Sequence, residues 1–151
     1  MYKRQANGWS LTRFEDLAKA LLAEGLSVVV TGSPQERIAL TPWLERMSGT
    51  PGFTDAVGAW TLAQLMDAVT QVRCVVASST GPLHMAAAQG TPTVGLYRSD
   101  APFWPERWGP LGSGEVLAVS EVEAEGGLNL SVEDVLAAVH RVRALDVTQS
   151  V

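Results

Sequence analysis

Apolar residues follow two rhythms along this chain, one typical of helices and one typical of buried strands. Between residues 11 and 24 they recur every three or four positions, which predicts an amphipathic helix. Thr12 and Glu15 have the spacing of a capping box at its start, and Gly25 supplies a stop. Short, mostly apolar runs, typical of strands buried on both faces, occur at 26–30, 74–77, 93–97 and 116–119, and a short strand is also predicted near 53–57.

Helical stretches separate these runs. They are predicted at about 34–48, from Thr61, at 83–89 and from Ser131 onward. Ser33 is the expected cap of the first, Pro34 its first residue, and Pro42 a break within it. Because strands and helices alternate, we expect an α/β fold, with about five or six strands in a doubly wound, mostly parallel, Rossmann-like sheet. Ligands of such sheets bind beyond the carboxyl ends of the strands.

Composition narrows the class of protein. The 151 residues fit one domain spanning 1–151, and 46% hydrophobic residues are enough for a core. The net charge of −5 disfavours nucleic acid as a partner. Cys74, His84 and His140 do not have the spacing of zinc ligands, so no metal is expected. We find neither a signal peptide nor an apolar run long enough to span a bilayer, and therefore expect a cytoplasmic location.

The turn after the first apolar run, Thr31 to Glu36, is the first candidate ligand site. Gly32 permits close approach of a ligand to the backbone, and the following helix start offers unpaired amides to an anion. Glu36 has two interpretations. It fits a capping box with Ser33, and it equally fits a carboxylate that accepts hydrogen bonds from the two hydroxyls of a ribose.

The turn Ser78-Ser79-Thr80-Gly81-Pro82-Leu83-His84 is more informative. It gathers three hydroxyls, a glycine, a first-turn proline and an imidazole around one predicted helix N-terminus. That combination suits a phosphate group. His84 taken alone fits a structural role equally well, and the adjoining hydroxyls favour ligand contact.

Common catalytic motifs are absent from the sequence. It contains no GxGxxG, GxxxxGK[ST], GxSxG or HExxH, so dinucleotide, P-loop, serine hydrolase and zinc protease chemistry lack their usual residues. Cys74 precedes an apolar run and is interpreted as a buried strand residue. We find no pair of carboxylates to act as acid and base, and therefore name no catalytic residue and no cofactor.

The stretch from Val75 to Tyr97 resembles the signature of glycosyltransferase family 9, the ADP-heptose:lipopolysaccharide heptosyltransferases. The family turn reads Asp, Ser or Thr, Gly-Pro, one residue, His, and then a small-residue helix that ends in Gly-Thr-Pro. Residues 28–36 and 58–65 are also similar to family segments. The likeness begins near Trp9 and leaves residues 1–8 poorly matched, which is compatible with a fragment boundary there.

The resemblance implies the donor-binding, C-terminal half of a two-domain GT-B enzyme that transfers a sugar with inversion and without a metal. Its donor is a nucleotide-diphosphate sugar, with an ADP-sugar expected first. An N-terminal acceptor domain supplies the base, so this chain alone binds donor without transferring it. The location implied is cytoplasmic, which allows peripheral contact with the inner membrane. By position, Thr80, Gly81 and Pro82 lie against the diphosphate, His84 bonds it, and Glu36 holds the ribose.

Two departures from the family pattern weaken this expectation. Ser79 stands where the family has an aspartate that contacts the donor sugar, and Asn7 stands where it has a lysine, for which Lys3 or Arg4 could substitute. They motivate an alternative, a non-catalytic Rossmann-like module that associates through its surface. The aromatic segment Phe103-Trp104-Pro105 with Trp108, in the long loop 98–114, is the surface expected for it, although these rings could also pack on the sheet.

Overall fold

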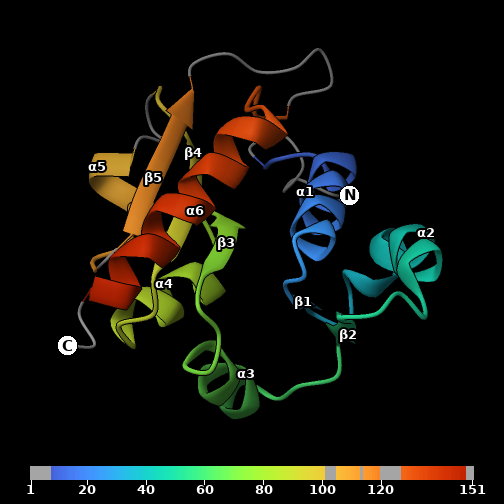
Figure 1. Ribbon diagram of the computed structural model, residues 1–151. Coiled ribbons are helices and arrows are strands. Elements are labelled where there is room, and N and C mark those ends of the chain that lie inside the picture. The colour runs from blue at the N-terminus through green and yellow to red at the C-terminus, as the bar shows by residue number, and fades with distance from the viewer. Residues whose placement is uncertain (1–7, 101–104, 113, 120–126, 149–151) are drawn as a thin grey trace.

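Helices and strands alternate from end to end of the chain (Figure 1). The structure is a computed structural model, and it describes residues 8–100, 105–112, 114–119 and 127–148. The elements are α1 (Leu11–Ala23), β1 (Val28–Gly32), α2 (Arg37–Met47), β2 (Phe53–Val57), α3 (Leu62–Val69), β3 (Val75–Ser78), α4 (Gly81–Ala88), β4 (Thr93–Arg98), α5 (Pro105–Trp108), β5 (Gly114–Val119) and α6 (Val132–Thr148).

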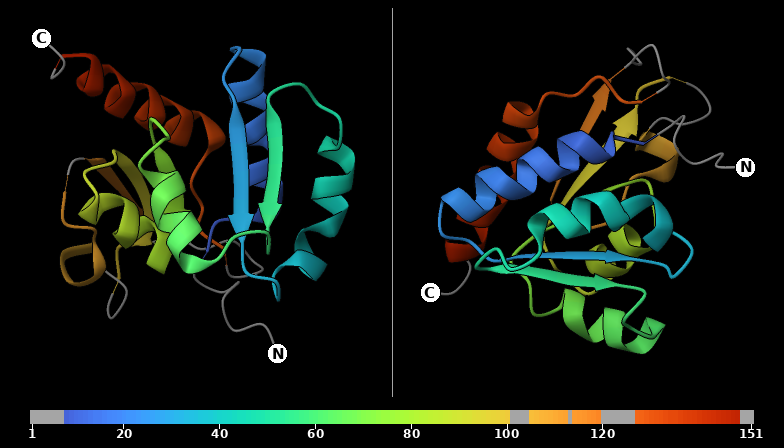
Figure 2. Two further views of the ribbon diagram at one scale, coloured as in Figure 1. Left: turned by 90° about the horizontal axis from the view of Figure 1, so that it is seen from below. Right: turned by 90° about the vertical axis from the view of Figure 1, so that its right-hand side faces the viewer.

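All five strands of the described chain pair in parallel, which confirms the predicted α/β class and strand direction. They form two hydrogen-bonded groups, β1–β2 and β3–β4–β5, where the sequence predicted one open sheet. In the right-hand view of Figure 2 the arrowheads of β1 and β2 point to the right, and those of β4 and β5 point upward and to the right. Because the strands of each group are parallel, the turns that follow them lie at one edge of that group.

Two hydrophobic cores hold these groups. The first joins Val94 and Leu96 of β4 to buried residues of α6, and the second lies between α2 and the β1–β2 pair. Helix α1 serves both, because its Leu17 is buried in the first core, its Ala18 in the second, and Phe14 packs against each. The two groups of strands are thus connected through the side chains of one helix.

The segment before α1 is bonded to the segment before α6. Trp9 is buried, and its indole Nε1–H donates to the Leu130 carbonyl at 2.8 Å. Arg13 donates to the carbonyls of Leu128 and Leu130, and the Leu128 amide donates to the Gly8 carbonyl at 3.0 Å. We call this set of bonds the terminal clamp. It fixes the entry to α1 against the segment that leads into α6.

The predicted cap of α1 was wrong. Ser10, and not Thr12, caps the helix, because its side chain accepts the Arg13 amide at 3.3 Å. Glu15 is buried instead, where it bonds Arg46 of α2 and, at 2.8 Å, Lys19 of its own helix. Glu15 therefore joins α1 to α2.

The start of α2 also differs from the prediction. The helix begins at Arg37 with Glu36 as its N-cap residue, whereas Ser33 and Pro34 belong to a separate turn that the Glu36 amide closes on the Ser33 carbonyl at 3.0 Å. Pro42 lies inside the helix without ending it. The buried side chains of Trp43, Leu44 and Met47 explain this continuation, because they anchor the second half of α2 in its core.

Other predicted starts are confirmed. Thr61 and Gln64 form a capping box at α3, and the Ser131 hydroxyl accepts the Asp134 amide at the start of α6. The long loop contains the short helix α5, while Phe103 and Trp104 of the predicted association surface lie outside the described residues. No helix in the described part of the chain is long and apolar enough to cross a membrane.

Candidate functional site

The turn between β3 and α4 presents an open helix N-terminus. Thr80 is the N-cap residue and its side chain makes no capping hydrogen bond, although the chain has a hydroxyl there. A Cβ built on Gly81 would meet nothing within 4 Å, so the space beside the first turn is empty of protein. The first-turn amides have no helical acceptors, and the dipole of this eight-residue helix favours an anion there.

His84 and Pro82 lie on the same turn. The His84 side chain is exposed, and its amide donates to the Thr80 carbonyl at 3.4 Å as the helix begins. Pro82 occupies the first turn, where its missing N–H costs no helical bond. The turn thus combines a hydroxyl, a free helix end and an exposed imidazole within five residues.

Ser79 forms a hydrogen bond with Tyr97 of β4, a contact that the sequence did not reveal. The Tyr97 ring is buried on β4, and burial raises the pKa of its hydroxyl while a hydrogen bond with Ser79 opposes that rise. Gly95 makes room for the ring, since a Cβ there would lie 2.7 Å from it. The hydrogen bond with the buried Tyr97 therefore holds the exposed Ser79 in place.

The turn between β1 and α2 brings Glu36 beside the end of β1. The Glu36 Oε2 atom accepts the Ser33 amide at 2.7 Å and the Ser33 hydroxyl at 2.8 Å. A Cβ on Gly32 would lie 3.5 Å from this oxygen, so the glycine brings the backbone close to the carboxylate. Both hydrogen bonds that the Glu36 carboxylate makes within the described residues use Oε2, which leaves Oε1 for an outside donor.

Trp60 is a residue at this edge that the sequence interpretation missed. It lies three positions after the end of β2, and 37% of its surface is exposed. The nearby Gly58 adopts a φ of +68°, and a Cβ there would lie 3.1 Å from Pro34, so the β2–α3 loop contacts the turn that carries Glu36. Its exposure follows from the fold, and the sequence around it carries no aromatic motif that could have identified it.

Neither Cys74 nor Asp100 has the properties of a reactive group. Burial raises the pKa of the Cys74 thiol to about 12, so the thiolate is scarce at neutral pH. Arg98 bonds both carboxylate oxygens of Asp100, at 2.7 and 2.6 Å, and lowers the pKa of that group. Asp100 is therefore a weak base.

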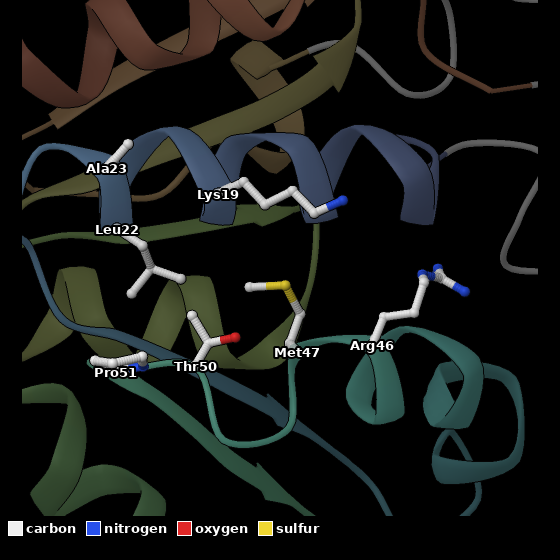
Figure 3. Close-up of a pocket in the computed structure, with 7 residues that line it drawn as sticks. All are labelled: Lys19, Leu22, Ala23, Arg46, Met47, Thr50 and Pro51. Atoms are coloured by element: carbon white, nitrogen blue, oxygen red, sulfur yellow. The ribbon is translucent and has the colours of Figure 1, made fainter.

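A cavity of about 500 Å³ lies away from both turns (Figure 3). Its lining combines three residues of α1 with four from the end of α2 and the following loop: Lys19, Leu22, Ala23, Arg46, Met47, Thr50 and Pro51. These segments lead into the amino ends of β1 and β2, whereas ligands of parallel α/β sheets bind at the carboxyl ends. Lys19 and Arg46 both face Glu15, so the charges at its rim are already paired.

Comparison with known proteins decides the family. The model of glycosyltransferase family 9 (heptosyltransferase) matches residues 3–131. The chain belongs to glycosyltransferase family 9. It is 29% identical over 91 residues to the lipopolysaccharide core heptosyltransferase OpsX of Haemophilus influenzae, a match that covers 59% of this chain and 26% of that protein.

Solved structures agree on the fold. The family 9 glycosyltransferase of Veillonella parvula superposes with a TM-score of 0.76 and 25% identity, over 91% of this chain and 42% of that one. The E. coli heptosyltransferase WaaC, solved with ADP, gives a TM-score of 0.74 at 18% identity, over 94% of this chain and 42% of its own. This family 9 chain spans about a quarter to a third of the length of the curated relatives it matches first.

Of the two positions at which the sequence departs from the expected pattern, the structure describes only Ser79. Ser79 carries no charge, whereas Asn7, Lys3 and Arg4 lie outside the described residues. In the described part of the chain no group of three or more histidine, cysteine, aspartate or glutamate side chains could hold a metal ion.

Proposed function

We propose that this chain is the donor-binding half of an inverting, metal-independent GT-B heptosyltransferase, and that it binds a nucleotide-diphosphate sugar, an ADP-sugar first. The observation that carries the proposal is the open N-terminus of α4, with empty space at Gly81 and exposed His84 on one turn. The ADP present in the WaaC structure supports the choice of nucleotide. The proposed domain is residues 1–151.

Each site residue has a part in this proposal. Thr80, Gly81 and Pro82 would lie against the diphosphate, and His84 would donate a hydrogen bond to it. Charge develops on the diphosphate as the bond to the anomeric carbon breaks, and fixed donors at a helix N-terminus stabilise that charge. Ser79 would contact the sugar without a charge, which should weaken binding compared with an aspartate.

The nucleoside would lie over the β1 and β2 ends. Glu36 would accept a ribose hydroxyl through Oε1 while Oε2 keeps its bonds to Ser33. Gly32 would keep the backbone close to the Glu36 carboxylate, because the place of a Cβ there is taken by Val57, Leu40 and Glu36. The exposed ring of Trp60 would offer an apolar face to the base. The bonds to Ser33 and the ribose contact would then use different oxygens of Glu36.

The acceptor side of the reaction would come from elsewhere. Transfer needs a base within reach of the acceptor hydroxyl, and the carboxylates of Glu36, Asp55 and Asp100 are each already bonded. We therefore propose an N-terminal acceptor domain as the partner, in a cytoplasmic enzyme that meets its acceptor at the inner membrane. Turnover by the 151 residues alone would contradict this part.

Calorimetric titration with ADP, ADP-heptose and a UDP-sugar tests the donor site. We expect the adenine nucleotides to bind more tightly, and Thr80→Ala and His84→Ala to weaken binding by about three- to tenfold each, the loss typical of one hydrogen bond. His140→Ala is the matched control, because His140 is an exposed histidine that bonds Glu24 on another face. No binding at millimolar nucleotide, or equal effects of the two histidine variants, would refute the proposal.

A further inference from the structure

The first turn of α2, which follows Glu36 directly, has little support from its own helix. Its N-cap residue makes no side-chain capping bond, and the turn carries no acidic residue to complement the helix dipole. Pro42 has no N–H to donate to the Ile38 carbonyl, so the turn also lacks one regular backbone bond. A helix end of this kind frays unless another element holds it.

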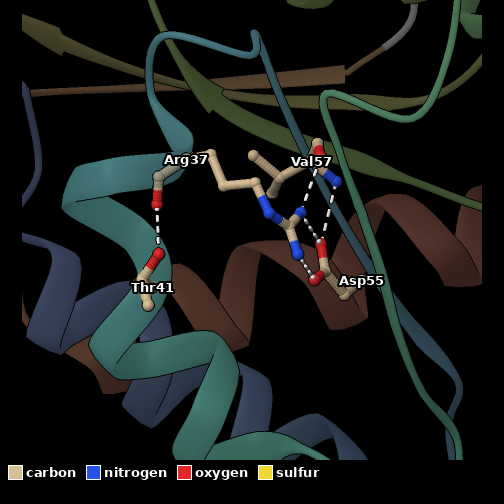
Figure 4. Close-up of polar contacts among 4 residues, drawn as sticks. All are labelled: Arg37, Thr41, Asp55 and Val57. Carbon is tan, nitrogen blue, oxygen red and sulfur yellow. Dashed lines mark hydrogen bonds and ion pairs between the residues drawn. The ribbon is translucent and has the colours of Figure 1, made fainter.

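Arg37 provides that hold from the first position of the helix (Figure 4). Its guanidinium donates to both oxygens of Asp55, at 3.2 and 2.7 Å, and to the Val57 carbonyl at 2.7 Å. The Val57 amide in turn donates to Asp55 at 2.9 Å. Thr41 donates to the Arg37 carbonyl at 2.8 Å, which bonds the same turn from inside. The start of α2 is thus fixed to the carboxyl end of β2.

The other side of Glu36 is fixed to the same strand end. The Gly58 amide donates to the Gly32 carbonyl at 2.8 Å, and the close approach of Gly58 to Pro34 limits movement of the turn. Glu36 therefore lies between two attachments to the end of β2. Of the two, only the Arg37 attachment is donated by a side chain, so a substitution can remove it while the Gly58–Gly32 bond remains.

We propose that Arg37 and Asp55 are positioning residues for Glu36, and that ribose recognition depends on their ion pair. The inference rests on the proposed function, because it assumes that Glu36 takes a ribose hydroxyl. A carboxylate selects a diol only if its oxygen is held in place, and a frayed first turn would let Glu36 sample orientations that miss the ligand. The ion pair would act on affinity for nucleotides with ribose hydroxyls and not on affinity for the phosphates.

The test compares two ligands, ADP and 2′,3′-dideoxy-ADP, by calorimetric titration of the full chain. We expect Arg37→Ala and Asp55→Asn to weaken ADP binding by about three- to tenfold while binding of the dideoxy nucleotide changes little. In a chain that already carries Glu36→Gln, the Arg37 substitution should weaken ADP binding hardly further, because both substitutions act on the same contact between Glu36 and the ribose. Arg37→Lys, which keeps the charge without the two-pronged geometry, should restore only part of the affinity.

Arg141→Ala is the matched control. Arg141 forms the same kind of exposed two-pronged pair with Glu115, at 2.7 and 2.7 Å, between α6 and β5. It should leave the affinity for both nucleotides unchanged. Equal losses for the two arginine variants, equal losses for the two nucleotides, or an additive effect with Glu36→Gln would each overturn the proposal.

A second measurement separates this proposal from the donor-site proposal. Amide hydrogen exchange in the absence of nucleotide should show faster exchange across residues 36–41 in Arg37→Ala than in Arg141→Ala. If wild type binds neither nucleotide, the donor-site proposal fails. Unchanged exchange in Arg37→Ala overturns the positioning role whatever the titrations show.

Discussion

Gly81 is surrounded by open space and Gly95 by packed side chains. Alanine at Gly81 should therefore affect ligand binding, and alanine at Gly95 should affect stability. A Cβ on Gly95 would lie 2.7 Å from the Tyr97 ring and 3.1 Å from Leu83, both buried, whereas one on Gly81 would meet nothing. We expect Gly95→Ala to lower the free energy of unfolding by about 1 to 3 kcal/mol through overpacking. Gly81→Ala should leave stability unchanged, or raise it slightly, because alanine favours the helix.

Binding should respond in the opposite order. A methyl group at Gly81 would enter the space that we assign to the diphosphate, so Gly81→Ala should weaken ADP binding in the same titration. Thermal and urea unfolding of both variants give the stability half of the comparison. A Gly81 variant with normal stability and normal ADP affinity would remove the diphosphate from this turn.

At this scale the sequence reveals only part of the site. The hydroxyls, glycine, proline and histidine of residues 78–84 are neighbours in the chain, so their gathering at a helix start could be predicted. The contact of Tyr97 with Ser79 could not, because Tyr97 lies on another strand and its orientation depends on the pairing of β3 with β4. Trp60 was missed because an isolated tryptophan carries no motif.

Between elements, Glu15 joins α1 to α2 and makes that contact sensitive to acid. The bond to Arg46, with Lys19 beside it, lowers the pKa of Glu15 to about 2 from its ordinary 4.5. A carboxyl whose pKa is lower in the folded state stabilises the protein fully above the ordinary value. That contribution is lost as the pH falls from about 4.5 toward 2.

Glu15→Gln should therefore lower the melting temperature by a few degrees at pH 7, and the difference from wild type should shrink as the pH approaches 2. Melting curves followed by circular dichroism between pH 2 and pH 7 measure it. Asp16→Asn, which changes an exposed carboxyl one position along the same helix, is the control and should match wild type. A constant difference across the range would mean that Glu15 acts by packing alone.

Most elements could be predicted from periodicity, but the exact starts of α1 and α2 could not. Thr12 and Glu15 have the spacing of a capping box. The Ser10 hydroxyl can equally accept the amide three residues on, that of Arg13, and in the structure it does. Pro42 normally breaks a helix, and here the buried side chains that follow it outweigh its missing bond. In both places tertiary packing decided between local alternatives that the sequence leaves equal.

For the whole molecule, helix α1 joins the two groups of strands, which are not paired with each other in the part of the chain that the structure describes. In the described chain the β1–β2 pair and the β3–β4–β5 group share no strand pairing, while α1 contributes to both cores. The sequence could predict five parallel strands but not their separation, because strand pairing between distant segments leaves no local pattern. The relative placement of the two candidate turns consequently depends on a helix that carries neither.

The terminal clamp has a consequence for the order of folding. Its bond from Trp9 to Leu130 joins residues 121 positions apart, so the loop it closes contains every element from α1 to β5, and closing so long a loop early is costly in entropy. The clamp should form after the folding transition state. Trp9→Phe would then speed unfolding by about three- to tenfold in stopped-flow experiments and leave the refolding rate nearly unchanged, whereas Trp60→Phe would alter neither. A slower refolding rate in the Trp9 variant would instead mean that the terminal clamp is already formed in the folding transition state.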